Sequence, residues 1–160
     1  MKQLLKKPII KNILFALAIL MFGYILLILT FIFDTIYQGI IRNIAGSFLN
    51  LSPDSTLYWF SPVMHGSFVL IIWLISWFIF KSKLKKIYKA IYLVIPTAVV
   101  LVTLGMFLYH WPILVYTIGS LFCGSTLYYF YKTNQPWIYY YAVILVSITL
   151  AIFTVIGGEI

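Results

Sequence analysis

Long runs without a charged residue dominate this chain and limit what it can fold into. Residues 12–33, 57–80, 90–131 and 138–156 contain no Asp, Glu, Lys or Arg. About 20 consecutive apolar residues cross the hydrocarbon core of a bilayer as an α-helix. The whole chain is 64% apolar and only 9% charged, whereas about 25% of residues are charged in soluble domains. The sequence therefore predicts an integral membrane protein.

The uncharged runs divide into five helical spans. The stretch 90–131 is long enough for two, and Pro112 disfavours helix at the residue before it, so we expect a turn there. Backbone groups in lipid must bond internally, which favours helices. We predict an all-α, five-helix transmembrane bundle that forms a single domain over residues 1–160. The predicted spans are residues 12–33, 57–80, 91–109, 113–131 and 138–156.

The basic residues predict the orientation of these spans. With the N-terminus inside and five crossings, all the lysines fall on the inner side and Arg42 alone falls on the outer side. The acidic residues Asp34, Asp54 and Glu159 also fall outside. This asymmetry fits the positive-inside rule, so we expect an inner N-terminus and an outer C-terminus. The inner lysines should attract anionic lipid headgroups. We expect a multi-pass protein of a cell membrane, typically the bacterial cytoplasmic membrane, and no nucleic-acid partner.

The longest loop, residues 34–56, has an amphipathic pattern of its own. Apolar side chains recur at helical spacing over residues 35–49, with polar ones on the opposite face. Asp34 is a good N-cap for such a helix. We expect a separate amphipathic helix at 35–49 that lies flat in the outer interface. It either covers a ligand pocket as a lid or only connects spans 1 and 2.

His65 is the ionisable residue that lies deepest within a predicted span. Intramembrane ionisable residues commonly serve as proton relays or ligand contacts, and the alternative is a neutral histidine bonded to a neighbouring helix. His110 lies at the outer end of span 3, about 12 Å from the depth of His65. A haem held by both histidines would need them at one depth. We therefore predict no cofactor.

The outer end of the bundle supplies the remaining candidates for a ligand site. Asp34 and Arg42 are eight residues apart, about two helical turns, and are candidates for an ion pair along the loop helix. The predicted ligand-binding residues are His65, Arg42, Asp34, Trp59 and His110. The chain contains no catalytic set of acids and bases and no cluster with metal-ligand spacing, so neither a catalytic nor a metal site is predicted and an enzyme is disfavoured.

Small residues on span 4 predict close helix contacts. Gly119 and Cys123 are four residues apart, as are Ser120 and Gly124. Such spacing places small side chains on successive turns, where another helix can approach closely. Cys123 is the only cysteine, so an intrachain disulfide is ruled out.

Two functions fit these patterns. The first is a non-enzymatic membrane protein that binds a lipid or a lipophilic small molecule inside the bundle, beneath the outer loop helix. The alternative is an accessory subunit of a membrane transport complex, or a protective (immunity) protein, that acts through helix–helix contacts with a partner or with a second copy. The layout of five spans with the longest loop outside is similar to that of the tryptophan-rich sensory proteins. Their Trp- and Pro-rich pocket signature is absent, so the similarity implies no function.

Overall fold

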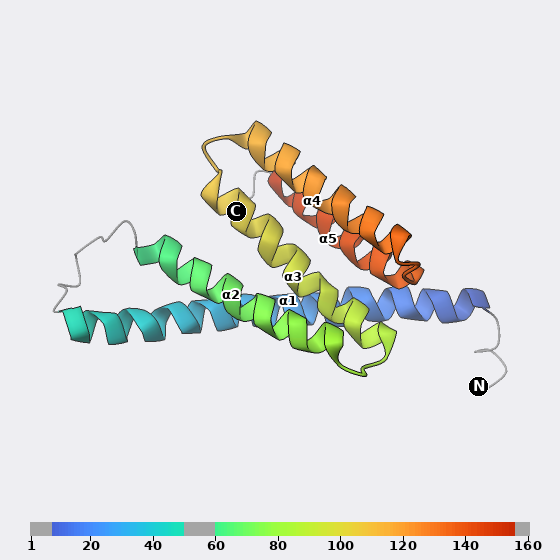
Figure 1. Ribbon diagram of the computed structural model, residues 1–160, viewed down its shortest axis with the longest axis horizontal. Helices are drawn as coiled ribbons and strands as arrows, with labels where there is room; N and C mark the ends of the chain where they lie inside the picture. The colour runs from blue at the N-terminus through green and yellow to red at the C-terminus, as the bar shows by residue number, and fades with distance from the viewer. Residues whose placement is uncertain (1–7, 50–59, 156–160) are drawn as a thin grey trace.

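The computed structural model describes residues 8–49 and 60–155, and all regular secondary structure in these ranges is α-helical (Figure 1). The helices are α1 (Pro8–Leu49), α2 (Phe60–Lys81), α3 (Lys86–Phe107), α4 (Pro112–Lys132) and α5 (Trp137–Val155). Each of them contains a stretch long and apolar enough to cross a membrane. The five-helix architecture is confirmed, and it indicates a multi-pass membrane protein.

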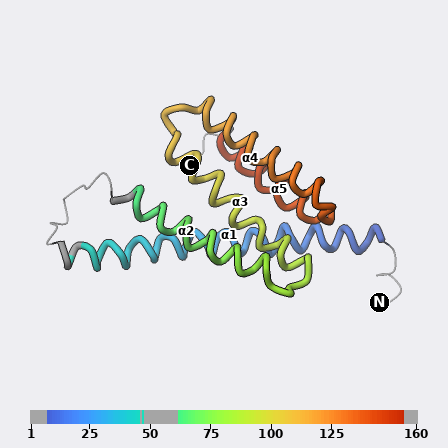
Figure 2. Tube along the Cα trace, in the orientation of Figure 1, coloured from blue at the N-terminus to red at the C-terminus, as the bar shows by residue number. Residues whose placement is uncertain are grey.

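Helix α3 is the centre of the bundle. It contacts each of the other four helices, and it lies between the α1/α2 pair and the α4/α5 pair (Figures 1 and 2). One of its faces presents Ala90, Val94 and Ala98 to a core shared with α1 and α5. Another presents Ile95 and Val99 to a smaller core that includes Phe68 of α2. Because its small and branched side chains meet neighbours on several sides, α3 is the most buried of the five spans.

A glycine sets the close approach of α1 to α3. A Cβ atom added at Gly23 would lie 2.9 Å from one methyl carbon of Val94, and the Cβ and second methyl of Val94 would be 3.5 and 3.6 Å away. Rotating the valine would therefore not clear the space. Small residues at such crossings allow the close backbone packing on which helix association in lipid depends.

The basic segments of the chain gather at one end of the bundle. The α2–α3 connection and the α4–α5 connection lie at the same end as the start of α1 (Figure 1). The side-chain amine of Lys89 donates hydrogen bonds to the carbonyls of Phe80 and Ser82, each at 2.7 Å, and so caps the end of α2. Asn134 takes a positive φ of 50° after α4, as residues that end helices in a left-handed turn do. These tight turns keep neighbouring spans antiparallel.

The prediction of a separate interfacial helix at residues 35–49 is wrong, because α1 continues through Asp34 to Leu49 without a break. Asp34 does not act as an N-cap: its Oδ2 accepts a hydrogen bond from Gln38 Nε2 at 2.9 Å, one turn further along the same helix. No proline interrupts the segment after Pro8. The 42-residue helix is about 63 Å long at 1.5 Å per residue, twice the roughly 30 Å of a hydrocarbon core.

We predict that Gly23→Ala lowers the free energy of unfolding by about 1–3 kcal/mol, since a Cβ placed 2.9 Å from the Val94 methyl overpacks the α1–α3 contact. The measurement is equilibrium unfolding of the purified protein in mixed micelles, followed by circular dichroism.

Gly39→Ala is the matched control, because a Cβ there meets nothing within 4 Å. It should leave stability unchanged or raise it slightly through helix propensity. Adding Val94→Ala to Gly23→Ala should recover part of the loss. Equal stability of the Gly23 and Gly39 variants would show that the two helices do not meet at Gly23.

Candidate functional site

A buried polar cluster joins α1, α2 and α3. His65 of α2 has its Nδ1 3.8 Å from Asp34 Oδ2 of α1, and its Nε2 lies 3.0 Å from Thr103 Oγ1 of α3. The side chains of His65 and Asp34 are only 6% and 13% exposed. The structure thus brings together two of the residues that the sequence singled out, although they lie on different helices.

Hydrogen bonds within and between helices hold this cluster in place. The hydroxyl of Thr103 donates to the carbonyl of Val99, one turn back on α3. A second link between α1 and α2 joins the Tyr37 hydroxyl to Ser67 Oγ at 2.9 Å. Ser67 itself donates to the carbonyl of Met64, so its single proton is used and Tyr37 must be the donor. The Tyr37–Ser67 pair is therefore a directed hydrogen bond between α1 and α2, in addition to the His65–Asp34 contact.

Aromatic rings surround the histidine. The ring centre of His65 lies 6.2 Å from that of Phe68 and 6.3 Å from that of Phe107. Phe68 in turn contacts the rings of Phe33 and Tyr37 at 6.2 and 6.3 Å. Phe68 is buried, while Phe33 and Phe107 are about half exposed. The dielectric is low beside a buried aromatic ring, so a polar contact there is stronger and an unpaired polar atom is more costly.

The other predicted ligand residues do not join this cluster. Arg42 is exposed on α1, and the ion-pair contact found for Asp34 in the described ranges is with His65, not with Arg42. His110 is exposed in the turn between α3 and α4, where its ring lies 3.6 Å from that of Tyr109. Trp59 lies outside the described residues. Within those residues, no group of three or more His, Cys, Asp and Glu side chains could hold a metal ion.

Thr103, Gln38 and Tyr37 contribute to the cluster but were not predicted from sequence. Both Gln38 and Tyr37 lie in the segment 35–49, which the sequence predicts as an interfacial helix outside the bundle. One signal was available for Gln38, since an Asp–Gln pair four residues apart is a recognised stabilising pair on a helix. Thr103 carried no comparable signal, because a lone threonine in an apolar span usually bonds its own helix.

The small residues of α4 divide between two faces. Gly119 and Cys123 point into the bundle: a Cβ at Gly119 would contact Leu101 of α3 at 3.5 Å, and Cys123 Sγ lies 3.1 Å from Ser147 Oγ of α5. Gly124 points away, with nothing within 4 Å of an added Cβ. The first pair therefore packs the bundle, while the outward face is left open.

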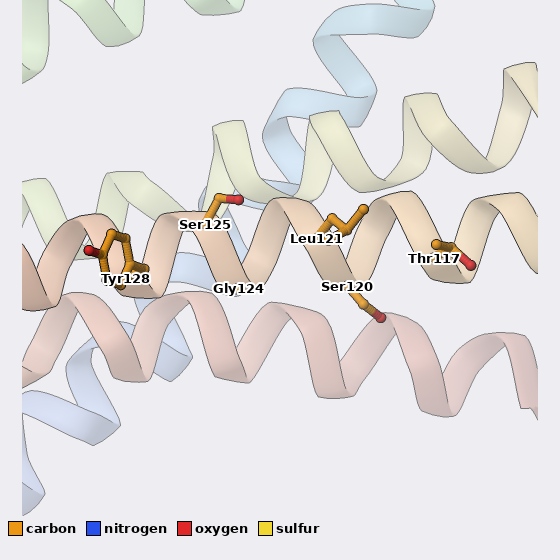
Figure 3. A pocket seen from close by; sticks show the side chains of 6 residues that line it. All are labelled: Thr117, Ser120, Leu121, Gly124, Ser125 and Tyr128. Atoms are coloured by element: carbon orange, nitrogen blue, oxygen red, sulfur yellow. The ribbon is translucent and has the colours of Figure 1, made fainter.

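Two hollows flank α4. The first is a cavity of about 310 Å³ bounded by three helices, with Leu101 and Leu104 from α3, Tyr116 and Gly119 from α4, and Ile148 and Ala151 from α5 among its walls. The second, about 550 Å³, is lined by residues of α4 alone (Figure 3). Because no second helix encloses it, we treat it as an outward groove, the α4 groove, formed by Thr117, Ser120, Leu121, Gly124, Ser125 and Tyr128.

No protein-family model matches the chain, and neither the curated proteins nor the solved structures compared with it include a match. The architecture and the sites themselves carry the functional argument.

We predict that Thr103→Val lowers the free energy of unfolding by about 0.5–2 kcal/mol, the range measured for hydrogen bonds between membrane helices. The substitution keeps the shape of the side chain but removes the acceptor of His65 Nε2. Equilibrium unfolding in mixed micelles measures the loss.

Thr117→Val is the control, since the Thr117 hydroxyl also bonds the carbonyl four residues back but lies on the exposed face of α4. It should change stability by less than about 0.5 kcal/mol. Similar losses in the two variants would show that the His65–Thr103 bond adds nothing to the fold.

Proposed function

We propose that the protein binds a lipid chain or a lipophilic small molecule in the cavity between α3, α4 and α5. The observation that carries this proposal is the cavity itself, about 310 Å³ with predominantly apolar walls drawn from three helices. Ligand sites are typically concave, mostly apolar and about 300–1,000 Å³ in volume, with a few polar groups that orient the ligand.

The polar groups of the cavity suit an amphipathic ligand. Tyr116, Ser120 and Thr154 add hydroxyl groups to its wall, and Cys123 and Ser147, which contact each other, also line it. No charged side chain lines it, which disfavours a charged headgroup inside. The volume is at the lower end of the range for ligand sites, so it suits one acyl chain or a small apolar molecule.

The orientation of the chain in the membrane suggests a second partner, the anionic lipid headgroups of the inner face. We place the ends of the helices that carry Lys81, Lys89 and Lys132 at the inner face of the bacterial cytoplasmic membrane, with the C-terminus outside, because basic residues concentrate on the cytoplasmic side. Lys81 Nζ lies 3.9 Å from the ring centre of Trp77, a pairing typical of the headgroup level. Anionic lipid headgroups are then expected around these lysines.

We predict that a fatty acid with a diazirine on its chain labels peptides of α3, α4 and α5 when the protein is irradiated in nanodiscs. Ala151→Phe should reduce this labelling about tenfold, because the larger side chain fills the cavity from α5; a difference of this size corresponds to about 1.4 kcal/mol. Mass spectrometry of the digested protein locates and quantifies the label.

Ile152→Phe is the matched control, since the neighbouring residue is exposed and does not line the cavity. It should be labelled like the natural protein. The cavity proposal fails if both variants label equally, or if the label spreads evenly over all five helices.

A second function, that of an accessory or protective membrane protein, is favoured by the α4 groove. Helix α4 is the least buried span, and its outward face carries the hydroxyl groups of Thr117, Ser120 and Ser125 beside Gly124. Small and hydroxylated residues at this spacing are typical of contacts between membrane helices. The occupant would be a transmembrane helix of a partner protein or of a second copy.

We predict that, if the α4 groove holds a partner helix, Gly124→Leu abolishes the complex seen by native mass spectrometry in mild detergent, because leucine blocks close approach. Gly39→Leu, at an equally open glycine of α1, should leave the complex intact. A monomer free of partners in the unsubstituted protein would remove this second function.

A further inference from the structure

The hydrogen bonds around His65 determine which of its nitrogens carries a proton. A threonine hydroxyl has one proton, and that of Thr103 is donated to the carbonyl of Val99. The oxygen of Thr103 can therefore only accept from His65 Nε2, 3.0 Å away. His65 Nε2 is thus an N–H donor, and in the neutral ring the other nitrogen, Nδ1, is a bare acceptor.

That bare nitrogen faces a carboxylate. Nδ1 of His65 lies 3.8 Å from Asp34 Oδ2, and Oδ2 already accepts from Gln38 Nε2. His65 Nδ1 and Asp34 Oδ1 are both buried and have no hydrogen-bond partner within the described part of the chain. Two buried acceptors that face each other are unfavourable. A proton on Nδ1 would turn one of these acceptors into a donor toward the carboxylate, whereas Oδ1 has no partner among the described residues.

Among the described residues, no lysine or arginine lies close enough to the Asp34–His65 pair to neutralise the carboxylate. On α1, the groups that face the pair are Asp34 itself and Tyr37, whose hydroxyl proton goes to Ser67. On α3 they are Thr103 and the ring of Phe107, and no residue from Ile91 to Phe107 carries a charge. On α2, no residue from Phe60 to Phe80 carries one. Arg42 lies eight residues along α1, about 12 Å by helical rise, and is exposed.

We propose that Asp34 and His65 form an intramembrane proton-binding site. The lone pair of His65 Nδ1 binds a proton from bulk water, and the resulting imidazolium forms an ion pair with the Asp34 carboxylate, whose Oδ2 lies 3.8 Å from Nδ1. The charge of the pair changes from −1 to zero. A neutral pair suits the aromatic surroundings, whereas an unpaired carboxylate there is costly.

The site links proton binding to the arrangement of three helices. When the proton is lost, the attraction between His65 of α2 and Asp34 of α1 is lost with it. The hydrogen bond from His65 to Thr103 of α3 remains. Neither hollow beside α4 is lined by Asp34, His65 or Thr103. The proposed proton site is therefore independent of the proposed ligand cavity, and each can be tested without the other.

The chain is well suited to a direct test, because His65 and His110 are its only two histidines. In the His110→Gln background, ¹⁵N-histidine labelling reports His65 alone. Nitrogen chemical shifts of the full chain in nanodiscs, recorded between about pH 5 and 8 where histidine titrates, distinguish the doubly protonated ring from each neutral tautomer. Asp34→Asn is the matched variant, because its amide has the same shape, carries no charge and can donate to a bare Nδ1.

At a fixed pH near neutrality, the doubly protonated fraction of His65 should fall about fivefold or more in Asp34→Asn, since the charge that favours imidazolium is gone. The remaining signal should be that of the neutral ring with Nε2–H. A doubly protonated fraction that is equal in both proteins would overturn the proposal. So would a neutral ring beside an ionised Asp34 over the whole range, which would indicate a bridging water in place of a proton.

A second measurement reads the carboxyl group and does not depend on the Asp34 variant. Asp34 and Asp54 are the only aspartates, so ¹³C-aspartate in the Asp54→Asn background gives one infrared carboxyl signal. In His65→Gln, we expect Asp34 to take the proton itself, and the band of the protonated acid should replace that of the carboxylate. A carboxylate that persists unchanged in His65→Gln would contradict the proposal.

Discussion

A serine or threonine hydroxyl has a single proton, and in this bundle that proton stays on its own helix. Each serine or threonine hydroxyl that links two helices in the described ranges donates to a carbonyl three or four residues back, and so it can only accept from the neighbouring helix. Apolar side chains gain little by leaving lipid for one another, so these directed bonds carry much of the specificity of the fold. The donor–acceptor pairs are Tyr24–Thr149, Tyr37–Ser67, His65–Thr103, Tyr92–Ser76 and Cys123–Ser147.

Helix α3 lies between two halves of the bundle, the α1/α2 side and the α4/α5 side, which are also joined directly by the Tyr24–Thr149 bond between α1 and α5. The half built from α1, α2 and α3 contains the smaller core and holds the Asp34–His65 pair. The half built from α3, α4 and α5 contains the cavity, to which α3 contributes Leu101 and Leu104 on either side of Thr103. A shift of α3 would therefore be felt in both halves. The polar Asp34–His65 pair and the apolar cavity lie on different sides of α3, and only this helix separates them.

The sequence was sufficient for the five-helix architecture, because uncharged runs of about 20 residues leave few alternatives in lipid. It also singled out His65, as an ionisable residue inside a span. It could not pair His65 with Asp34, because helical spacing relates residues of one helix and says nothing about which faces of two helices meet. The break expected at Asp34 was wrong for a similar reason: the side chain suits an N-cap, but it bonds Gln38. Small-residue spacing on α4 likewise could not tell Gly119, which faces Leu101 of α3, from the open Gly124.

Because α1 is long, a small rotation of this helix displaces its distant end by a much larger distance than the residues near its contact with α3. It crosses α3 at Gly23, and helical rise places Asp34 about 16 Å and Leu49 about 39 Å beyond that crossing. A rotation about the crossing therefore moves Leu49 more than twice as far as Asp34. A bilayer acts on such a helix through its thickness, because an apolar helix longer than the hydrocarbon layer tilts further as the layer thins. The same tilt changes the distance between Asp34 and His65. Membrane thickness would therefore change the affinity of the proposed Asp34–His65 site for a proton.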